Sequence, residues 1–129
     1  MASILIVEDE VAIRWTLERV LKKKGHTVRC AANGKQGVEL YLEQHTDIVI
    51  TDVVMPVMDG LEVIREILRH EPEAKIITMS GSGSSTSSYD YLAIAKKFGA
   101  VRTIRKPFGA NVLRALVDEV LTLSSIPAE

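Results

Sequence analysis

The sequence has a single cysteine, few aromatic residues and no long apolar run. Cys30 is the only cysteine in 129 residues, so the chain cannot form an internal disulfide. No apolar run approaches the ~20 residues that a membrane-spanning helix needs, and no basic stretch followed by an apolar segment marks a signal peptide. We therefore expect a cytoplasmic protein that makes no contact with membranes.

The sequence also lacks an excess of charge of either sign. Lys and Arg number 16 against 17 Asp and Glu, and the formal net charge is -1. Nucleic acids and anionic membranes favour a basic surface, so we expect no direct binding of nucleic acid. A chain of this length can bury a core without disulfides or metal. We predict one domain over residues 1–129, with a core at about 3–123 and a tail at 124–129.

Short apolar runs alternate along the chain with segments whose apolar residues recur at helical spacing. Such alternation predicts a parallel sheet covered by helices on both faces, and right-handed crossovers limit its topology. We expect an α/β fold of the doubly wound (βα)5 flavodoxin-like type, a three-layer sandwich with strand order 2-1-3-4-5. The predicted strands are Ser3–Val7, His26–Ala31, Asp47–Thr51, Ala74–Met79 and Val101–Arg105, and the predicted helices are Glu10–Lys24, Lys35–Glu43, Leu61–Arg69, Tyr89–Phe98 and Ala110–Leu123.

Acids, a hydroxyl and a lysine follow the carboxyl ends of four predicted strands. In an open α/β sheet, ligands bind beyond these ends, where the strand order reverses. Each residue alone has an ordinary explanation, since an acidic pair often begins a helix and a lone serine or lysine is usually solvated. Their coincidence at one edge predicts a functional site. The residues are Glu8, Asp9, Asp52, Ser80 and Lys106.

Three carboxylates in one place repel each other unless a cation offsets their charge. Mg²⁺ prefers oxygen ligands and commonly takes one or two carboxylates plus a substrate phosphate. Glu8 and Asp9 are suited to hold it, which leaves Asp52 to act as a nucleophile towards phosphorus. Lys106 and the Ser80 hydroxyl can then stabilise charge on the phosphoryl oxygens.

Five segments resemble the response-regulator receiver domain of two-component signalling. They are "ILIVEDE", "DIVITDVVMPVMDGLEVI", "IITMSG", "FGA" and "RKPF", and the resemblance extends from about Ser3 to Leu123. It implies that Asp52 accepts a phosphoryl group from a histidine kinase or a histidine phosphotransfer protein, and that small phosphodonors also serve. It implies further that the domain catalyses only its own phosphorylation and dephosphorylation. The downstream protein target is unknown.

The resemblance also assigns a role to each residue of the predicted site. Glu8, Asp9 and Asp52 would hold Mg²⁺ or Mn²⁺ together with the main-chain carbonyl of Val54. Ser80 would be the switch hydroxyl, and Lys106 would pair with the phosphoryl group. Phosphorylation would change the surface formed by the fourth helix, fifth strand and fifth helix. The family also commonly has a cis bond where this chain has Lys106-Pro107.

The chain departs from the family pattern in three places. Thr103 stands where an aromatic switch residue is usual, so the usual coupling of an aromatic ring to the switch hydroxyl cannot operate. The segment from Ser80 to Gly99 is about four residues longer than usual, and its glycines and serines predict a mobile loop and a displaced or shortened fourth helix. The acidic pair is Glu8-Asp9 rather than two aspartates, which keeps both carboxylates.

Two other functions compete with a phosphoacceptor switch. A receiver-like module that binds partners without phosphorylation is compatible with Thr103 and the long loop. A haloacid-dehalogenase-like phosphatase also uses an aspartate, Mg²⁺ and a lysine, but it needs a second acid where this chain has Val54.

Two further expectations concern single residues outside the predicted site. Trp15 lies off the apolar stripe of its helix, so we expect it to be partly exposed, either packed at the helix edge or in contact with a kinase. We expect His26, like the other two histidines, at the surface.

Overall fold

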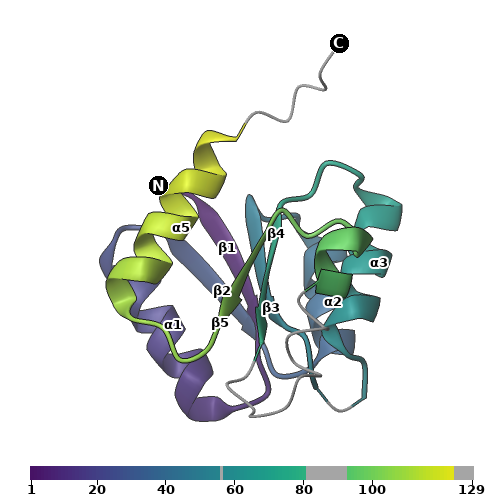
Figure 1. The fold of residues 1–129 in the computed structure, drawn as a ribbon, viewed down its shortest axis with the longest axis horizontal. Helices are drawn as coiled ribbons and strands as arrows, with labels where there is room; N and C mark the ends of the chain where they lie inside the picture. The colour runs from purple at the N-terminus through teal and green to yellow at the C-terminus, as the bar shows by residue number, and fades with distance from the viewer. Residues whose placement is uncertain (56, 81–92, 124–129) are drawn as a thin grey trace.

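A parallel sheet of five strands forms the middle layer of the molecule (Figure 1). The computed structural model describes residues 1–55, 57–80 and 93–123. The strand order is β2-β1-β3-β4-β5, and every neighbouring pair is parallel, so the predicted fold class is confirmed. The strands are β1 (Ser3–Val7), β2 (Thr27–Ala31), β3 (Ile48–Asp52), β4 (Ile76–Ser80) and β5 (Arg102–Arg105).

Helices cover both faces of this sheet. α1 and α5 lie on one face, and α2 and α3 lie on the other (Figure 1). Residues 93–98 are also helical, in agreement with part of the predicted fourth helix. The start of that helix and the predicted loop before it lie outside the described residues. The helix bounds are α1 (Val11–Lys23), α2 (Gly34–Glu43), α3 (Gly60–His70) and α5 (Ala110–Thr122).

Local signals explain where two of the helices begin or end. The Asp59 side chain accepts a hydrogen bond of 3.0 Å from the Glu62 amide, which satisfies one of the unpaired donors at the start of α3. After α1 the chain leaves through Gly25 with φ of +103°, a left-handed conformation that glycine adopts without a steric penalty. Both helices therefore have the termini that their flanking residues predict.

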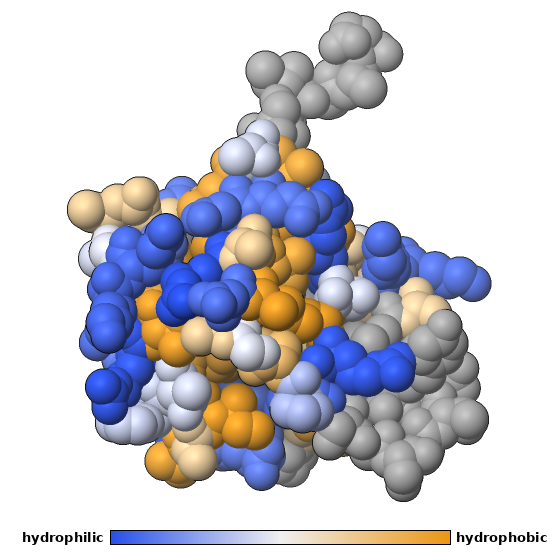
Figure 2. Space-filling model, turned by 60° about the vertical axis from the view of Figure 1, so that its left-hand side comes forward, coloured by the Kyte–Doolittle hydropathy of each residue, from blue (hydrophilic) through white to orange (hydrophobic). Residues whose placement is uncertain are grey.

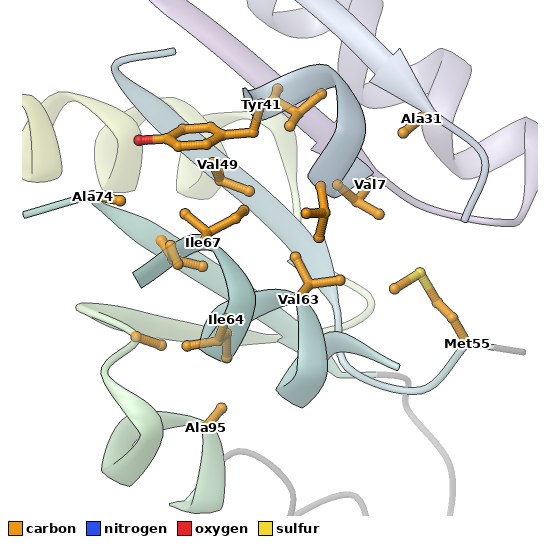
Figure 3. Close-up of a cluster of buried hydrophobic side chains, with 14 residues drawn as sticks. Val7, Ala31, Tyr41, Val49, Met55, Val63, Ile64, Ile67, Ala74 and Ala95 are labelled. Atoms are coloured by element: carbon orange, nitrogen blue, oxygen red, sulfur yellow. The ribbon is translucent and has the colours of Figure 1, made fainter. Parts of the chain in front are cut away.

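The sheet is apolar on both faces because both are packed against helices. Every residue of β3 and β4 is buried, as expected for central strands of a doubly wound sheet. On one face Val49 and Val7 pack against Val63 and Ile67 of α3 and against Tyr41 of α2 (Figure 3). On the other face, residues of β1 and β3 pack against buried leucines and valines of α1 and α5. These two cores fix the strand ends rigidly.

One expectation about single residues is wrong. His26 is buried, with 7% of its surface exposed, because its ring packs under the N-terminus and its Nδ1 accepts a hydrogen bond of 3.1 Å from the Ala2 amide. Trp15 is 56% exposed, in agreement with the prediction. No helix in the described part of the chain is both long and apolar enough to cross a bilayer.

Candidate functional site

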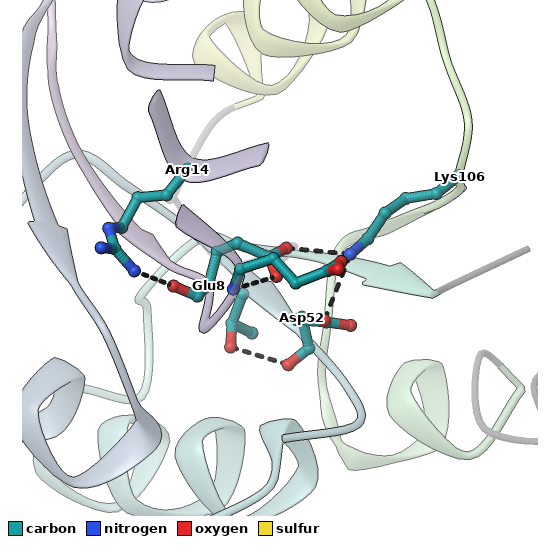
Figure 4. A network of polar contacts seen from close by, with 6 residues as sticks. Glu8, Arg14, Asp52 and Lys106 are labelled. Atoms are coloured by element: carbon teal, nitrogen blue, oxygen red, sulfur yellow. Dashed lines mark hydrogen bonds and ion pairs between the residues drawn. The ribbon is translucent and has the colours of Figure 1, made fainter. Parts of the chain in front are cut away.

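Three charged side chains meet at the carboxyl ends of the strands (Figure 4). The Lys106 Nζ atom lies 2.9 Å from Glu8 Oε1 and 3.2 Å from Asp52 Oδ2. Glu8 is fully buried, and Asp52 and Lys106 have exposed fractions of only 6% and 9%. One lysine therefore balances two carboxylates in a place where water has little access.

Burial and neighbouring charges shift the pKa of all three groups. Burial raises the pKa of Glu8, and the charge of Asp52 raises it further. Burial likewise raises the pKa of Asp52, against the opposing effect of the Lys106 charge. Burial alone would lower the pKa of Lys106, but its bonds to Glu8 and Asp52 raise it overall. The cluster thus has one carboxylate more than its lysine can neutralise, and it is suited to accept a further cation.

Asp9 completes a group of three acids that fits a divalent cation. One carboxylate oxygen from each of Glu8, Asp9 and Asp52 lies within 4.8 Å of the others. Asp52 Oδ1 is buried and has no hydrogen-bond partner, which is costly for a carboxylate oxygen unless a ligand completes its shell. Oxygen donors of this kind suit Mg²⁺ or Mn²⁺. The residues present therefore fit the predicted metal, and they are the ones that the sequence predicted.

The parallel register of the sheet brings these residues together. Val7 of β1 lies opposite Thr51 of β3, so the next residues along, Glu8 and Asp52, emerge side by side. The Lys106 amide donates a hydrogen bond of 2.8 Å to the Ser80 carbonyl, which continues the pairing of β5 with β4 to the same edge. Neighbouring strand ends thus deliver an acid, an acid and a cation to one point.

Gly60 is required beneath Asp52 because two backbones approach closely there. A Cβ atom at Gly60 would lie 2.2 Å from the Asp52 carbonyl oxygen and 2.7 Å from Val53 Cα. The Gly60 amide also donates a hydrogen bond of 2.6 Å to the Val53 carbonyl. This contact fixes the start of α3 against the end of β3 and holds the Asp52 main chain in place.

The sequence did not reveal two groups that position Glu8. Arg14 Nη1 donates a hydrogen bond of 2.7 Å to the Glu8 carbonyl, and the Glu10 amide donates one of 3.1 Å to Glu8 Oε2. An arginine in the first turns of a helix is common at solvent-exposed positions, so the sequence alone offers no reason to single out Arg14. Its side chain folds back over the strand end only because α1 turns sharply away from β1 (Figure 4).

The other predicted site residues lie where the fold should place them. Ser80 is fully buried at the end of β4, and Val54 lies two residues beyond Asp52 with its side chain 55% exposed. Thr103 is half-buried on β5 and lies opposite Thr78 of β4. The roles of the Ser80 hydroxyl, the Val54 carbonyl and Thr103 stay predictions.

The peptide bond between Lys106 and Pro107 is cis, as the resemblance to receiver domains predicts.

Comparison with known proteins agrees with this geometry. The family model for the response regulator receiver domain matches residues 4–118. The chain belongs to this family. Receiver domains are signalling domains of two-component systems rather than turnover enzymes; they use a divalent metal at an acidic pocket and obtain phosphate from histidine kinases.

Several receiver proteins resemble the chain along most of its length. It is 40% identical over 115 residues to the chemotaxis protein CheY of Thermotoga maritima, covering 88% of this chain and 92% of CheY. A crystal structure of a receiver domain protein from Clostridium thermocellum has a TM-score of 0.86 at 30% identity and 94% coverage of both chains. The regulatory protein AtoC of Escherichia coli is 32% identical over 126 residues, but the chain spans only 26% of AtoC. The length of such relatives makes the activity of any whole protein a matter for proposal.

Proposed function

We propose that this receiver domain is a phosphoacceptor switch in which Asp52 takes a phosphoryl group from a histidine kinase or a histidine phosphotransfer protein. The observation that carries the proposal is the buried cluster in which Lys106 Nζ contacts both Glu8 and Asp52. A lysine held at this point can bond to a phosphoryl oxygen on Asp52 without first being moved into the site.

In the transfer step, a carboxylate oxygen of Asp52 forms a bond to phosphorus as the bond from phosphorus to the histidine nitrogen breaks. The electron pair of the broken bond stays on the imidazole. Asp52 Oδ1 is suited to a new bond because it is buried and has no hydrogen-bond partner. The Lys106 ammonium stabilises the charge on the phosphoryl oxygens in the transition state.

Glu8, Asp9 and Asp52, together with the Val54 carbonyl, would hold Mg²⁺ or Mn²⁺. When bound, the metal supplies charge neutralisation for the three acids and for the incoming phosphoryl oxygens. The short distances among the three carboxylates support this assignment. Arg14 and the Glu10 amide hold Glu8 in the orientation that the site requires.

Phosphorylation then acts as a switch by adding charge and acceptor oxygens beside Lys106 and Ser80. Contacts from these residues to the phosphoryl group would pull on the ends of β4 and β5. The surface around residues 93–98, β5 and α5 would change and expose a site for a downstream protein. Hydrolysis of the acyl phosphate, catalysed by the domain itself, resets the switch. Because Thr103 carries no ring, this coupling runs without the usual aromatic rotation.

Intact-mass analysis tests the proposal directly. Incubation with acetyl phosphate and Mg²⁺ should add the mass of one phosphoryl group to the wild type and none to Asp52→Asn. Asp59→Asn is the matched control, since Asp59 lies seven positions later, beyond the buried cluster, and should leave the modification intact. A wild type that stays unmodified would refute the proposal.

Thr103 favours one second candidate, a module that binds partners without phosphorylation. NMR spectra recorded with beryllofluoride, a phosphoryl mimic, separate the two functions. A switch should show shifts that extend from Asp52 to β5 and α5. A binding module should show shifts only next to Asp52.

A further inference from the structure

A groove follows the boundary between α1 and α5 on the side of the molecule shown in Figure 2. Its first part is a cavity of about 440 Å³ between α1 and the segment from Lys106 to Phe108. Its second part is a hollow of about 330 Å³ between α1 and Arg114 of α5. Thr16 lines both parts, so they form one continuous groove that begins at the phosphorylation site. We call it the α1/α5 groove.

The two ends of the α1/α5 groove have different chemistry. At the end near Lys106 the walls are largely apolar and include Ile13, Pro107 and Phe108. At the far end the described lining contains three cations, Arg19, Lys23 and Arg114, and no acid. Figure 2 shows apolar side chains gathered in the middle of this side of the molecule and hydrophilic ones around them.

Trp15 lies between the two ends and gives the groove an exposed apolar anchor. The indole is 56% exposed, although tryptophan is among the costliest side chains to leave in water. The Arg19 guanidinium lies 4.6 Å from its ring centroid, a cation–π contact that orients both side chains. Exposed tryptophan and arginine side chains of this kind are the residues most enriched at the energetic centres of protein interfaces.

We propose that the α1/α5 groove binds an amphipathic segment of another protein, with its apolar residues over Phe108 and its acidic residues over Arg19, Lys23 and Arg114. Charge complementarity selects an acidic ligand, since the far end presents three cations and no acid among its lining residues. The groove follows α1 from Glu10 to Lys23, about 20 Å at the rise of an α-helix, which suits a helix of similar length.

Other occupants fit the groove less well. A nucleic acid usually needs a long basic track, and this chain has a net charge of -1 and only three cations here. The Lys22 side chain on the same helix is paired with Glu18 at 2.7 Å and does not extend the basic end. A second copy of the chain would have to offer an acidic, apolar-tipped segment, and the test below detects that case.

The proposal deepens the proposed function, because a segment bound in this groove lies beside Lys106 and would position its protein at the phosphorylation site. The two ideas nevertheless fail separately. Binding is measured without Mg²⁺ or a phosphodonor, whereas phosphorylation by acetyl phosphate needs no protein partner.

The test uses the full chain and a fluorescein-labelled helical peptide of about 14 residues, a length that spans about 20 Å. The peptide carries leucines in one half and glutamates in the other. We expect binding by fluorescence anisotropy, weakening with added salt, and a blue shift of the emission of Trp15, the only tryptophan in the chain. The double variant Arg19→Glu/Lys23→Glu should bind roughly tenfold more weakly or worse.

Lys24→Glu is the matched control, because it makes the same charge change one position beyond Lys23 and outside the groove lining. It should bind within about twofold of the wild type. Circular dichroism verifies that each variant is folded. A nitroxide on the leucine half of the peptide should broaden the NMR signals of Phe108 and Ile13 and spare those of Lys23 and Arg114.

Four results would overturn the proposal. They are no binding by the folded wild type, an equal loss in Lys24→Glu, tighter binding of a single-stranded oligonucleotide than of the peptide, and broadening at the basic end. A Trp15 shift that depends on protein concentration alone would assign the groove to a second copy and also overturn it.

Discussion

The ion pairs at the carboxyl edge of the sheet and those on the helix surfaces have similar lengths but different surroundings. Arg102 and Glu119 approach to 2.6 Å, closer than Lys106 approaches either Glu8 at 2.9 Å or Asp52 at 3.2 Å. Yet the side chains of the first pair are 33% and 52% exposed, whereas those of Lys106 and Glu8 are 10% and 0% exposed.

This difference teaches that distance alone does not rank ion pairs. An exposed pair is screened by water and contributes about 0–1 kcal/mol. A buried cluster has lost its hydration, so its members depend on each other and removal of one leaves the others stranded. The Lys106 cluster is poor as a device for stability, because it holds two carboxylates for one lysine. Its arrangement makes sense as a binding site for a cation and a phosphoryl group.

The largest effect should come from Lys106→Met, which keeps the side-chain stem and removes the charge. It leaves Glu8 and Asp52 buried without a counter-ion, and the free energy of unfolding at neutral pH should fall by about 3–5 kcal/mol without metal. Urea denaturation gives this value. Arg102→Met is the matched comparison at an exposed pair and should lose no more than about 1 kcal/mol. Equal losses would contradict the contrast between the two regions.

Mg²⁺ should stabilise only the buried cluster. At about 100 times its dissociation constant it should raise the free energy of unfolding by about 2.7 kcal/mol, since it binds the folded site and not the unfolded chain. Calorimetry with and without a chelator measures the gain. Asp9→Asn should reduce it, and Glu119→Gln should leave it unchanged. A gain of the same size in both variants would place the metal elsewhere.

Arg14→Met should have an intermediate effect, because Arg14 is half-buried and donates to the Glu8 carbonyl at 2.7 Å. We expect a loss of about 1–2 kcal/mol in the free energy of unfolding and weaker Mg²⁺ binding, since Glu8 loses its orientation. Arg19→Met is the control on the same helix, with an exposed guanidinium. If both variants bind Mg²⁺ like the wild type, Arg14 has no positioning role.

His26 should show the smallest effect, visible only as a pH dependence. Burial lowers its pKa, and the nearby α-amino group lowers it further. The unfolded chain therefore takes up the proton at higher pH than the folded protein does. Stability should be complete above the ordinary histidine pKa of about 6.5 and should fall as the pH drops from there through the lowered folded value.

Urea midpoints measured across this range should lose part of their acid-side slope in His26→Gln. The exposed His70 provides the control, and His70→Gln should alter the slope less. The same slope in all three proteins would mean that His26 does not contribute.

The residues of the site could be predicted because parallel strands bring their carboxyl ends to one edge. Glu8, Asp52 and Lys106 each follow an apolar run that can only be a buried strand, so their meeting follows from topology. Strand ends differed by at most two residues from prediction, as for β4, which begins at Ile76 rather than Ala74. Such shifts arise because hydrogen bonding to neighbours, which the sequence does not show, decides where a ladder stops.

Other features depended on side-chain packing and could not be predicted. His26 looked like a surface residue because histidine is polar, but the fold places the N-terminus over its ring. Arg14 gave no signal because its partner is a main-chain carbonyl, which every residue has. The α1/α5 groove likewise needed the structure, since its walls come from segments far apart in the chain.

The account depends most on Asp52 being the atom carrier for the phosphoryl group, and borohydride reduction tests this directly. Borohydride converts the acyl phosphate of an aspartate to homoserine, which peptide mapping by mass spectrometry locates. After treatment with acetyl phosphate and Mg²⁺, homoserine should appear at position 52 and nowhere else. Homoserine at another aspartate, or its absence from a protein shown to be folded, would contradict the account.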